Sequence, residues 1–172
     1  MPFRLRLAFM VVVLSTALTG CARDSNQALW MRLNRWFELE KTVYFESRFR
    51  CTVAVYRVAS DAPRASFPVQ QDPGTAKQQF RIGRLAAVRM SGYSPHDIAD
   101  ALLLSGDGMF GKEVLAAAAQ AGPCFKGTMA EPAILRAMTR PGATLAYDRE
   151  SEGMMILDPV SMAVFYIAGD VW

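Results

Sequence analysis

Three apolar segments near the C-terminus constrain the fold more than any other part of the chain. They cover residues 143–148, 154–157 and 162–168, and each has a length and composition typical of a β-strand. Short polar turns at residues 151–153 and 158–161 separate them, which favours an antiparallel meander. The last segment is apolar on both faces, so we expect it to lie in the interior of a sheet.

Residues 42–49 and 51–59 are rich in valine, tyrosine, phenylalanine and threonine and are also predicted to be strands. The second of these segments is apolar on both faces, so we expect it to be covered on both sides and to complete the sheet. The join at residues 48–50 contains no typical turn sequence. Either a tight hairpin or one long bent strand fits it.

Helical spacing of apolar residues recurs in the remaining segments. The expected helices cover about residues 27–40, 75–90, 95–104, 110–121 and 131–139, and the proline-rich residues 60–74 are expected to form a loop. The chain therefore predicts an α+β domain in which a C-terminal three-stranded antiparallel meander is joined by an N-terminal strand. About four or five helices are expected to pack on one side of this sheet.

The first expected helix, residues 27–40, carries two tryptophans and two arginines. These residues, Trp30, Arg32, Arg35 and Trp36, suit a surface that meets a membrane or another protein. The alternative is that the apolar stripe of the helix packs on the domain core while the arginines are solvated. We favour the second interpretation, because core packing is the usual role of such a stripe.

The chain begins with a short basic segment, an apolar run and a cysteine. Arg4 and Arg6 precede an apolar run at residues 7–18, which leads into Leu18-Thr19-Gly20-Cys21. The run has about a dozen residues, whereas a helix that spans a membrane needs about 20. The pattern therefore fits a cleavable signal better than a permanent span.

This start resembles the signal peptide and lipobox of bacterial lipoproteins. The resemblance implies that residues 1–20 are removed, that Cys21 carries a diacylglycerol thioether, and that its amine carries a further acyl chain such as palmitate. It also implies a cell-envelope protein facing the periplasm, and Ala22 in place of aspartate favours the outer over the inner membrane. Residues 21–26 would then be a short tether and residues 27–172 a single globular domain. An ordinary secretory signal and an uncleaved anchor are the alternatives.

Removal of Arg4 and Arg6 would lower the formal net charge from +3 to +1 (3 − 2). A chain so close to neutrality lacks the basic surface typical of nucleic-acid binders, so no nucleic acid is expected as a partner. Cys51 and Cys124 are the two cysteines that remain after Cys21. In an oxidising compartment such a pair predicts a disulfide, with two free buried thiols or a reactive thiol as alternatives.

The residue patterns indicate neither catalysis nor a cofactor. His96, the only histidine, lies in the first turn of an expected helix, and no Gly-x-Ser-x-Gly motif accompanies it. One histidine and two separated cysteines do not match the usual ligand spacing of a zinc site. Residues 106–112 have the glycine and lysine spacing of a phosphate loop, but Glu113 occupies the position of the required hydroxyl residue.

Four acidic residues cluster about the turns of the C-terminal strands, namely Asp148, Glu150, Glu152 and Asp158. Paired carboxylates can act as acid and base, and clusters of oxygen atoms can hold calcium. Their spacing matches no defined calcium loop, so we interpret them as solvated turn residues.

The sequence thus predicts a lipid-anchored protein of the cell envelope with a structural or protein-interaction role. Its expected partners are the membrane, through the anchor, and another envelope protein that docks on the first helix or on a face of the sheet. A small-molecule or lipid carrier is the second hypothesis, and a hydrolase ranks last.

Overall fold

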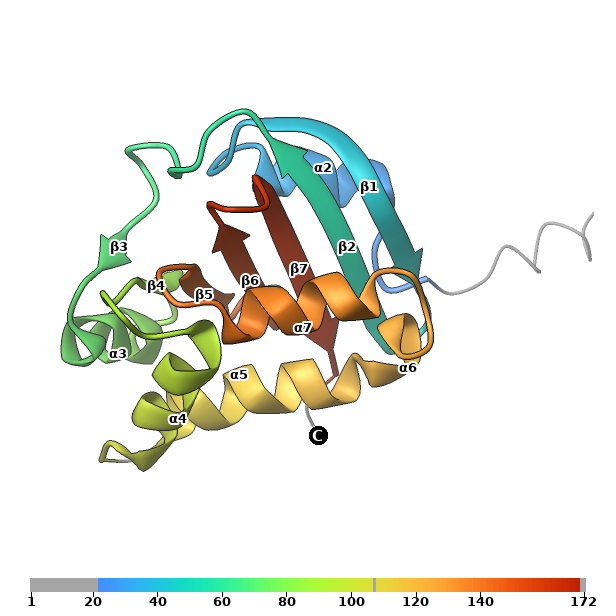
Figure 1. Cartoon of the computed structure of the whole chain (residues 1–172). Coiled ribbons are helices and arrows are strands. Elements are labelled where there is room, and N and C mark those ends of the chain that lie inside the picture. Colours follow the sequence, from blue (N-terminus) through green and yellow to red (C-terminus); the bar gives the residue numbers. More distant parts are fainter. Residues whose placement is uncertain (1–21, 107, 171–172) are drawn as a thin grey trace, which may run out of the picture.

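The computed structural model of the chain describes residues 22–106 and 108–170 (Figure 1). The expected signal peptide and the lipidation site at Cys21 lie outside the described residues, as does the apolar tail Val171-Trp172.

Seven strands form one mixed sheet. They are β1 (Leu39–Ser47), β2 (Cys51–Val58), β3 (Val69–Gln70), β4 (Ala86–Val88), β5 (Thr144–Asp148), β6 (Gly153–Asp158) and β7 (Ala163–Gly169). Their order across the sheet is β1-β2-β7-β6-β5-β4-β3, and every neighbouring pair is antiparallel except β3 and β4. Strand β2, from the N-terminal half of the chain, therefore pairs with the C-terminal strand β7 in the interior of the sheet.

The α+β class is confirmed, but the expected sheet is too small. Strands β5, β6 and β7 do pair in succession through two hairpins. They belong to a seven-stranded sheet, however, and not to a three-stranded meander joined by one N-terminal strand. The interior position of β7 is confirmed, because it lies between β2 and β6 and all its residues are buried. The tight hairpin at residues 48–50 is also present, closed by the Arg48 amide, which donates to the Cys51 carbonyl.

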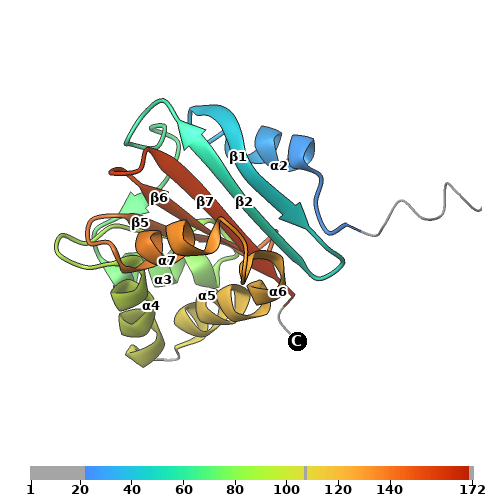
Figure 2. The ribbon, with the colours of Figure 1, turned by 45° about the vertical axis from the view of Figure 1, so that its right-hand side comes forward.

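Helices cover both faces of the sheet. They are α2 (Asn26–Leu33), α3 (Pro73–Arg81), α4 (Pro95–Leu104), α5 (Met109–Gln120), α6 (Gly122–Phe125) and α7 (Glu131–Thr139). Helix α2 packs on one face, and α3 to α7 pack on the other (Figure 2). The expectation that all helices lie on one side is therefore wrong. Among the described residues, no helix combines the length and the apolar character that crossing a membrane requires.

Each face of the sheet has its own hydrophobic core because side chains alternate along the strands. On the face of α3 to α7, Val53 and Phe165 pack with Phe110 of α5. On the opposite face, Tyr56 and Tyr166 pack with Leu29 of α2. The two cores explain why β2 and β7 are apolar on both faces.

Two expected helices are longer than the helices that form. The helix expected at residues 75–90 ends at Arg81, and Gly83 with a φ of +73° turns the chain into β4. A left-handed φ of this kind favours glycine and ends the helix. The helix expected at residues 27–40 ends at Leu33, and Leu39 already belongs to β1. By contrast, α4 begins as expected, with a capping box between Ser94 and Asp97.

Gly111 is required by the packing of α5 against α4. A Cβ atom at this position would lie 2.2 Å from the backbone nitrogen of Leu103 and 2.7 Å from the carbonyl oxygen of Ala99. Both of these atoms belong to the backbone, so a side chain here must push the two helices apart. Close helix packing therefore accounts for Gly111, the glycine that gives residues 106–112 the spacing of a phosphate loop.

We expect Gly111→Ala to lower the free energy of unfolding by about 2 to 3 kcal/mol, because overpacking a rigid contact is destabilising. The matched control is Gly127→Ala, since no atom lies within 4 Å of a Cβ at that position, although its φ of +75° adds some strain. Urea denaturation measures both variants. Equal losses of stability in the two variants would contradict the packing explanation.

Candidate functional site

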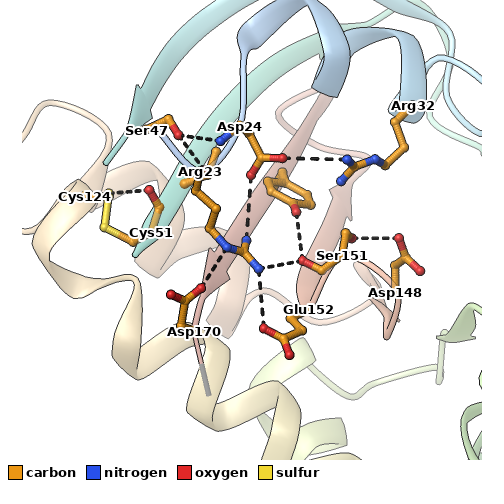
Figure 3. Close-up of polar contacts among 12 residues, drawn as sticks. Arg23, Asp24, Arg32, Ser47, Cys51, Cys124, Asp148, Ser151, Glu152 and Asp170 are labelled. Carbon is orange, nitrogen blue, oxygen red and sulfur yellow. Dashed lines mark hydrogen bonds and ion pairs between the residues drawn. A yellow bond between two sulfur atoms is a disulfide. The ribbon is translucent and has the colours of Figure 1, made fainter. Parts of the chain in front are cut away.

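Arg23, at the start of the described chain, is bonded to three distant parts of the fold. Its backbone amide donates to the carbonyl of Arg48 at 3.0 Å. Its guanidinium donates to the Asp170 carboxylate at 3.0 Å and to the Ser151 carbonyl at 2.8 Å (Figure 3). These contacts attach the beginning of the chain to the β1–β2 turn, to the end of β7 and to the β5–β6 turn.

Asp24 extends this set of contacts toward α2. Its amide donates to the Ser47 hydroxyl at 2.9 Å, and its carboxylate lies 3.7 Å from the guanidinium groups of both Arg23 and Arg32. We call Arg23, Asp24 and Asp170 the N-terminal clamp. The clamp fixes residues that the sequence analysis assigned to a tether, so the domain follows position 21 almost directly.

Opposite charges lie close together in the clamp, and most of their surface is buried. The side chain of Arg23 is 15% exposed and that of Asp24 is 10% exposed. Burial lowers the pKa of Arg23, but the negative charges near it outweigh burial and hold the pKa above its usual value. Burial raises the pKa of Tyr166, which lies beside the clamp, and the negative charge of Asp24 raises it further. Arg23 therefore remains charged and Tyr166 neutral at physiological pH.

A disulfide joins Cys51 and Cys124 at the same end of the molecule, as expected from the sequence. It links the first residue of β2 to α6 across a sequence separation of 73 residues. The Tyr44 hydroxyl donates to the Cys124 carbonyl at 2.9 Å and adds a contact from β1. The Cys124 sulfur and the Cys51 carbonyl oxygen are 3.0 Å apart, which is a van der Waals contact because a disulfide sulfur carries no proton (Figure 3). The disulfide thus ties the helical layer to the sheet beside the clamp.

Of the four residues of the expected membrane or partner face, Arg32, Arg35 and Trp36 line one surface groove. Trp30 and Trp36 are half-buried and pack on the core of the α2 face, where Trp30 meets the ring of Tyr56 edge-on. Arg32 is close to Asp24 of the clamp, and Arg35 is exposed. This arrangement favours the interpretation in which the helical stripe packs on the domain.

In the described part of the chain, three surface hollows are large enough for ligands, and the smallest of them, of about 360 Å³, lies beside Phe49 and Pro123. A cleft of about 840 Å³ lies at the β3–β4–β5 edge, beside the proline-rich loop, and Phe67, Arg64 and Arg89 are among its lining residues. A groove of about 440 Å³ lies between α2 and the β5–β6 turn, where Arg35 and Glu150 carry opposite charges. None of these three hollows lies in the packed core between the sheet and α3 to α7.

Of the other candidate residues, His96 and Asp148 make local contacts, whereas Asp158 also pairs with Arg140 and Glu152 pairs with Arg23 of the clamp. His96 is half-exposed on α4, and its ring nitrogen lies 3.7 Å from the carboxylate of Asp100. Asp148 and Asp158 are buried, which corrects their interpretation as solvated acids. Each accepts hydrogen bonds from within its own turn, Asp148 from the Ser151 hydroxyl and Asp158 from the Ser161 hydroxyl. Within residues 22–106 and 108–170, histidine, cysteine and acidic side chains form no group of three or more that fits a metal ion.

Sequence reasoning missed the N-terminal clamp. Arg23 and Asp24 were assigned to the tether, and their partners at residues 151 and 170 are more than a hundred positions away. No local pattern around Arg23 and Asp24 indicates these distant partners.

No protein-family profile matches the chain, and neither a curated protein nor a solved structure resembles it significantly.

Proposed function

We propose that this chain is a lipid-anchored protein of the bacterial cell envelope, acylated on Cys21 and facing the periplasm, with the outer membrane as its favoured location. The observation that carries the proposal is the basic start, apolar run and cysteine of residues 1–21. Arg23 is attached to the fold only two positions after Cys21. An anchor at Cys21 would therefore hold the domain directly at the bilayer. The disulfide supports an oxidising compartment, because such bonds are rare in the cytosol.

The domain's role, in this proposal, is to present a binding surface to another envelope protein. The corner between α4 and α5 exposes apolar side chains, with Leu104 86% exposed, Met109 50% and Leu103 39%. This corner lies at the opposite end of the molecule from the start of the described chain (Figures 1 and 2). An exposed group of large apolar residues is typical of a protein contact, and here it would face away from the membrane.

The carrier hypothesis remains the second candidate because of the cleft of about 840 Å³. Its volume falls in the range of small-molecule sites, and Arg64 and Arg89 would suit an anionic group on the ligand. Native mass spectrometry of the protein released from membranes distinguishes the two roles. A carrier retains a small molecule of defined mass, and Arg89→Glu should abolish that retention.

Photo-crosslinking in living cells tests the interaction role. A benzophenone amino acid replaces Leu104 in one variant and Met129 in the other, because these residues are 86% and 87% exposed. Leu104 ends α4, whereas Met129 lies in the turn between α6 and α7. We expect position 104 to give one protein adduct of defined mass, and position 129 to give none. Leu103→Glu in the same chain should remove the adduct, since it places a charge in the contact. Equal adducts at both positions, or none at either, would count against docking at this corner.

A further inference from the structure

The β1–β2 turn brings an apolar side chain to the same end of the molecule as the clamp. Phe49 is 67% exposed at the tip of the turn, more than any other aromatic side chain in residues 22–106 and 108–170. Arg48 and Arg50 flank it and are also exposed. The guanidinium of Arg48 lies 2.9 Å from Glu46 while its side chain remains 57% exposed.

Backbone hydrogen bonds hold both ends of the three-residue tip, residues 48–50. The carbonyl of Arg48 accepts a hydrogen bond from the Arg23 amide, and the carbonyl of Arg50 accepts one from the Asp170 amide. The tip is therefore braced by the start of the chain on one side and by the end of β7 on the other. The backbone of the turn therefore needs no further ordering to present Phe49, which lines a small hollow with Gln120 and Pro123.

Chain length places the tip beside the anchor. Arg23 follows Cys21 by two positions, so their Cα atoms are separated by about 7 Å at most. The Arg23 amide is bonded to Arg48, the residue before Phe49. Acyl chains on Cys21 would therefore enter the bilayer close to Phe49. A bilayer is thus the surface that this tip meets first.

We infer that the turn at residues 48–50 is a second membrane contact, in which Phe49 enters the interface of an anionic bilayer and the two arginines lie among its headgroups. The inference rests on the proposed lipid anchor. Aromatic rings at an interface, flanked by basic residues that reach the headgroups, are a common arrangement of peripheral membrane proteins. The anchor and the tip together define two points of attachment, and these restrict rotation of the domain on the membrane.

A synthetic tether tests this contact without relying on lipidation in cells. The chain from Cys21 to Trp172 contains every described residue, and its disulfide leaves Cys21 as the free thiol. This thiol is coupled to a maleimide lipid in vesicles that contain phosphatidylglycerol and a spin-labelled lipid. In one sample, 4-fluorophenylalanine replaces Phe49, and its fluorine relaxation rate reports how close position 49 lies to the spin-labelled lipid. A separate sample carries 4-fluorophenylalanine at Val160, which is 71% exposed in the β6–β7 turn at the other end of β7.

We expect relaxation at position 49 to be at least about tenfold faster than at position 160, because the length of β7 adds roughly 20 Å between the bilayer and the second probe. Replacing both Arg48 and Arg50 with serine should weaken the effect at position 49 by about fivefold or more on these vesicles. Equal relaxation at the two positions, or faster relaxation at position 160, would overturn the contact while leaving the lipid anchor intact. An unmodified Cys21 in cells would instead overturn the anchor, and it would not change the result with the synthetic tether.

Discussion

Replacing both Cys51 and Cys124 with alanine is expected to lower the free energy of unfolding by about 4 kcal/mol. The disulfide joins residues 73 positions apart, so it restricts the unfolded chain strongly and stabilises the folded state by comparison. The closed loop begins with β2, contains β3, α3, β4, α4 and α5, and ends in α6. A loss of this size is a large fraction of the total stability of a typical domain.

Urea denaturation of the oxidised chain and of the double-alanine variant measures this difference, with Cys21 replaced by serine in both proteins to remove the third thiol. The single variant Cys51→Ala is the matched comparison, because it breaks the bond but leaves the Cys124 thiol in the core. We expect it to be as unstable as the double variant or more so. A loss below about 1 kcal/mol in the double variant would show that the bond contributes little to folding.

Transferring the chain to an export signal without a lipobox, with Cys21→Ser, is expected to release it from the membrane into the soluble periplasm. Each methylene buried in the bilayer contributes about 0.8 kcal/mol, so two or three acyl chains hold a protein almost irreversibly. The tip at Phe49 alone cannot replace them, since one interfacial side chain contributes only about 1 to 3 kcal/mol. We therefore expect the soluble fraction to rise by about a hundredfold or more.

Cell fractionation followed by a wash with high salt and carbonate measures this release. The control keeps the native residues 1–21 and carries the Cys51→Ala and Cys124→Ala changes, so it tests whether Cys21 alone among the cysteines is needed. We expect this control to stay in the membrane fraction. Retention of the Cys21→Ser chain in that fraction would show that another part of the protein binds the membrane.

The central strands could be predicted from the sequence because their patterns are local. Residues 163–169 and 51–58 are apolar on both faces, and both strands lie inside the sheet with a helix layer on each side. The start of α4 was equally clear, since Ser94 and Asp97 form a capping box and Pro95 is the first residue of the helix. Such signals survive in any tertiary setting, because the interacting residues are neighbours in the chain.

Strand β4, near the β3 edge of the sheet, could not be predicted because its pattern is not local. Strand β4 has three residues, Ala86–Val88, and Val88 also fits the helical spacing set by Phe80 and Leu85. Its assignment as a strand depends on pairing with β5, which lies more than fifty positions away. Short strands of this kind are decided by tertiary contacts that a local pattern does not contain.

The same limit applies to the candidate site. Arg23 is separated from Ser151 by 128 positions and from Asp170 by 147, and nothing in the residues around it indicates these partners. Phe49 reads as part of an ordinary apolar strand in the sequence, and only the fold places it at an exposed tip beside the start of the chain. The disulfide was predictable because few cysteines are present, so the number of pairings was small.

Lipidation of Cys21 is the central claim, and mass spectrometry of the N-terminal peptide tests it most directly. The protein is purified from membranes of cells grown with labelled palmitate and digested, and the peptide that contains Cys21 is isolated. The account predicts a labelled peptide that begins at Cys21 and carries a diacylglycerol on its sulfur and an acyl chain on its amine. An unlabelled peptide with a free thiol, in a precursor that still begins at Met1, would contradict it.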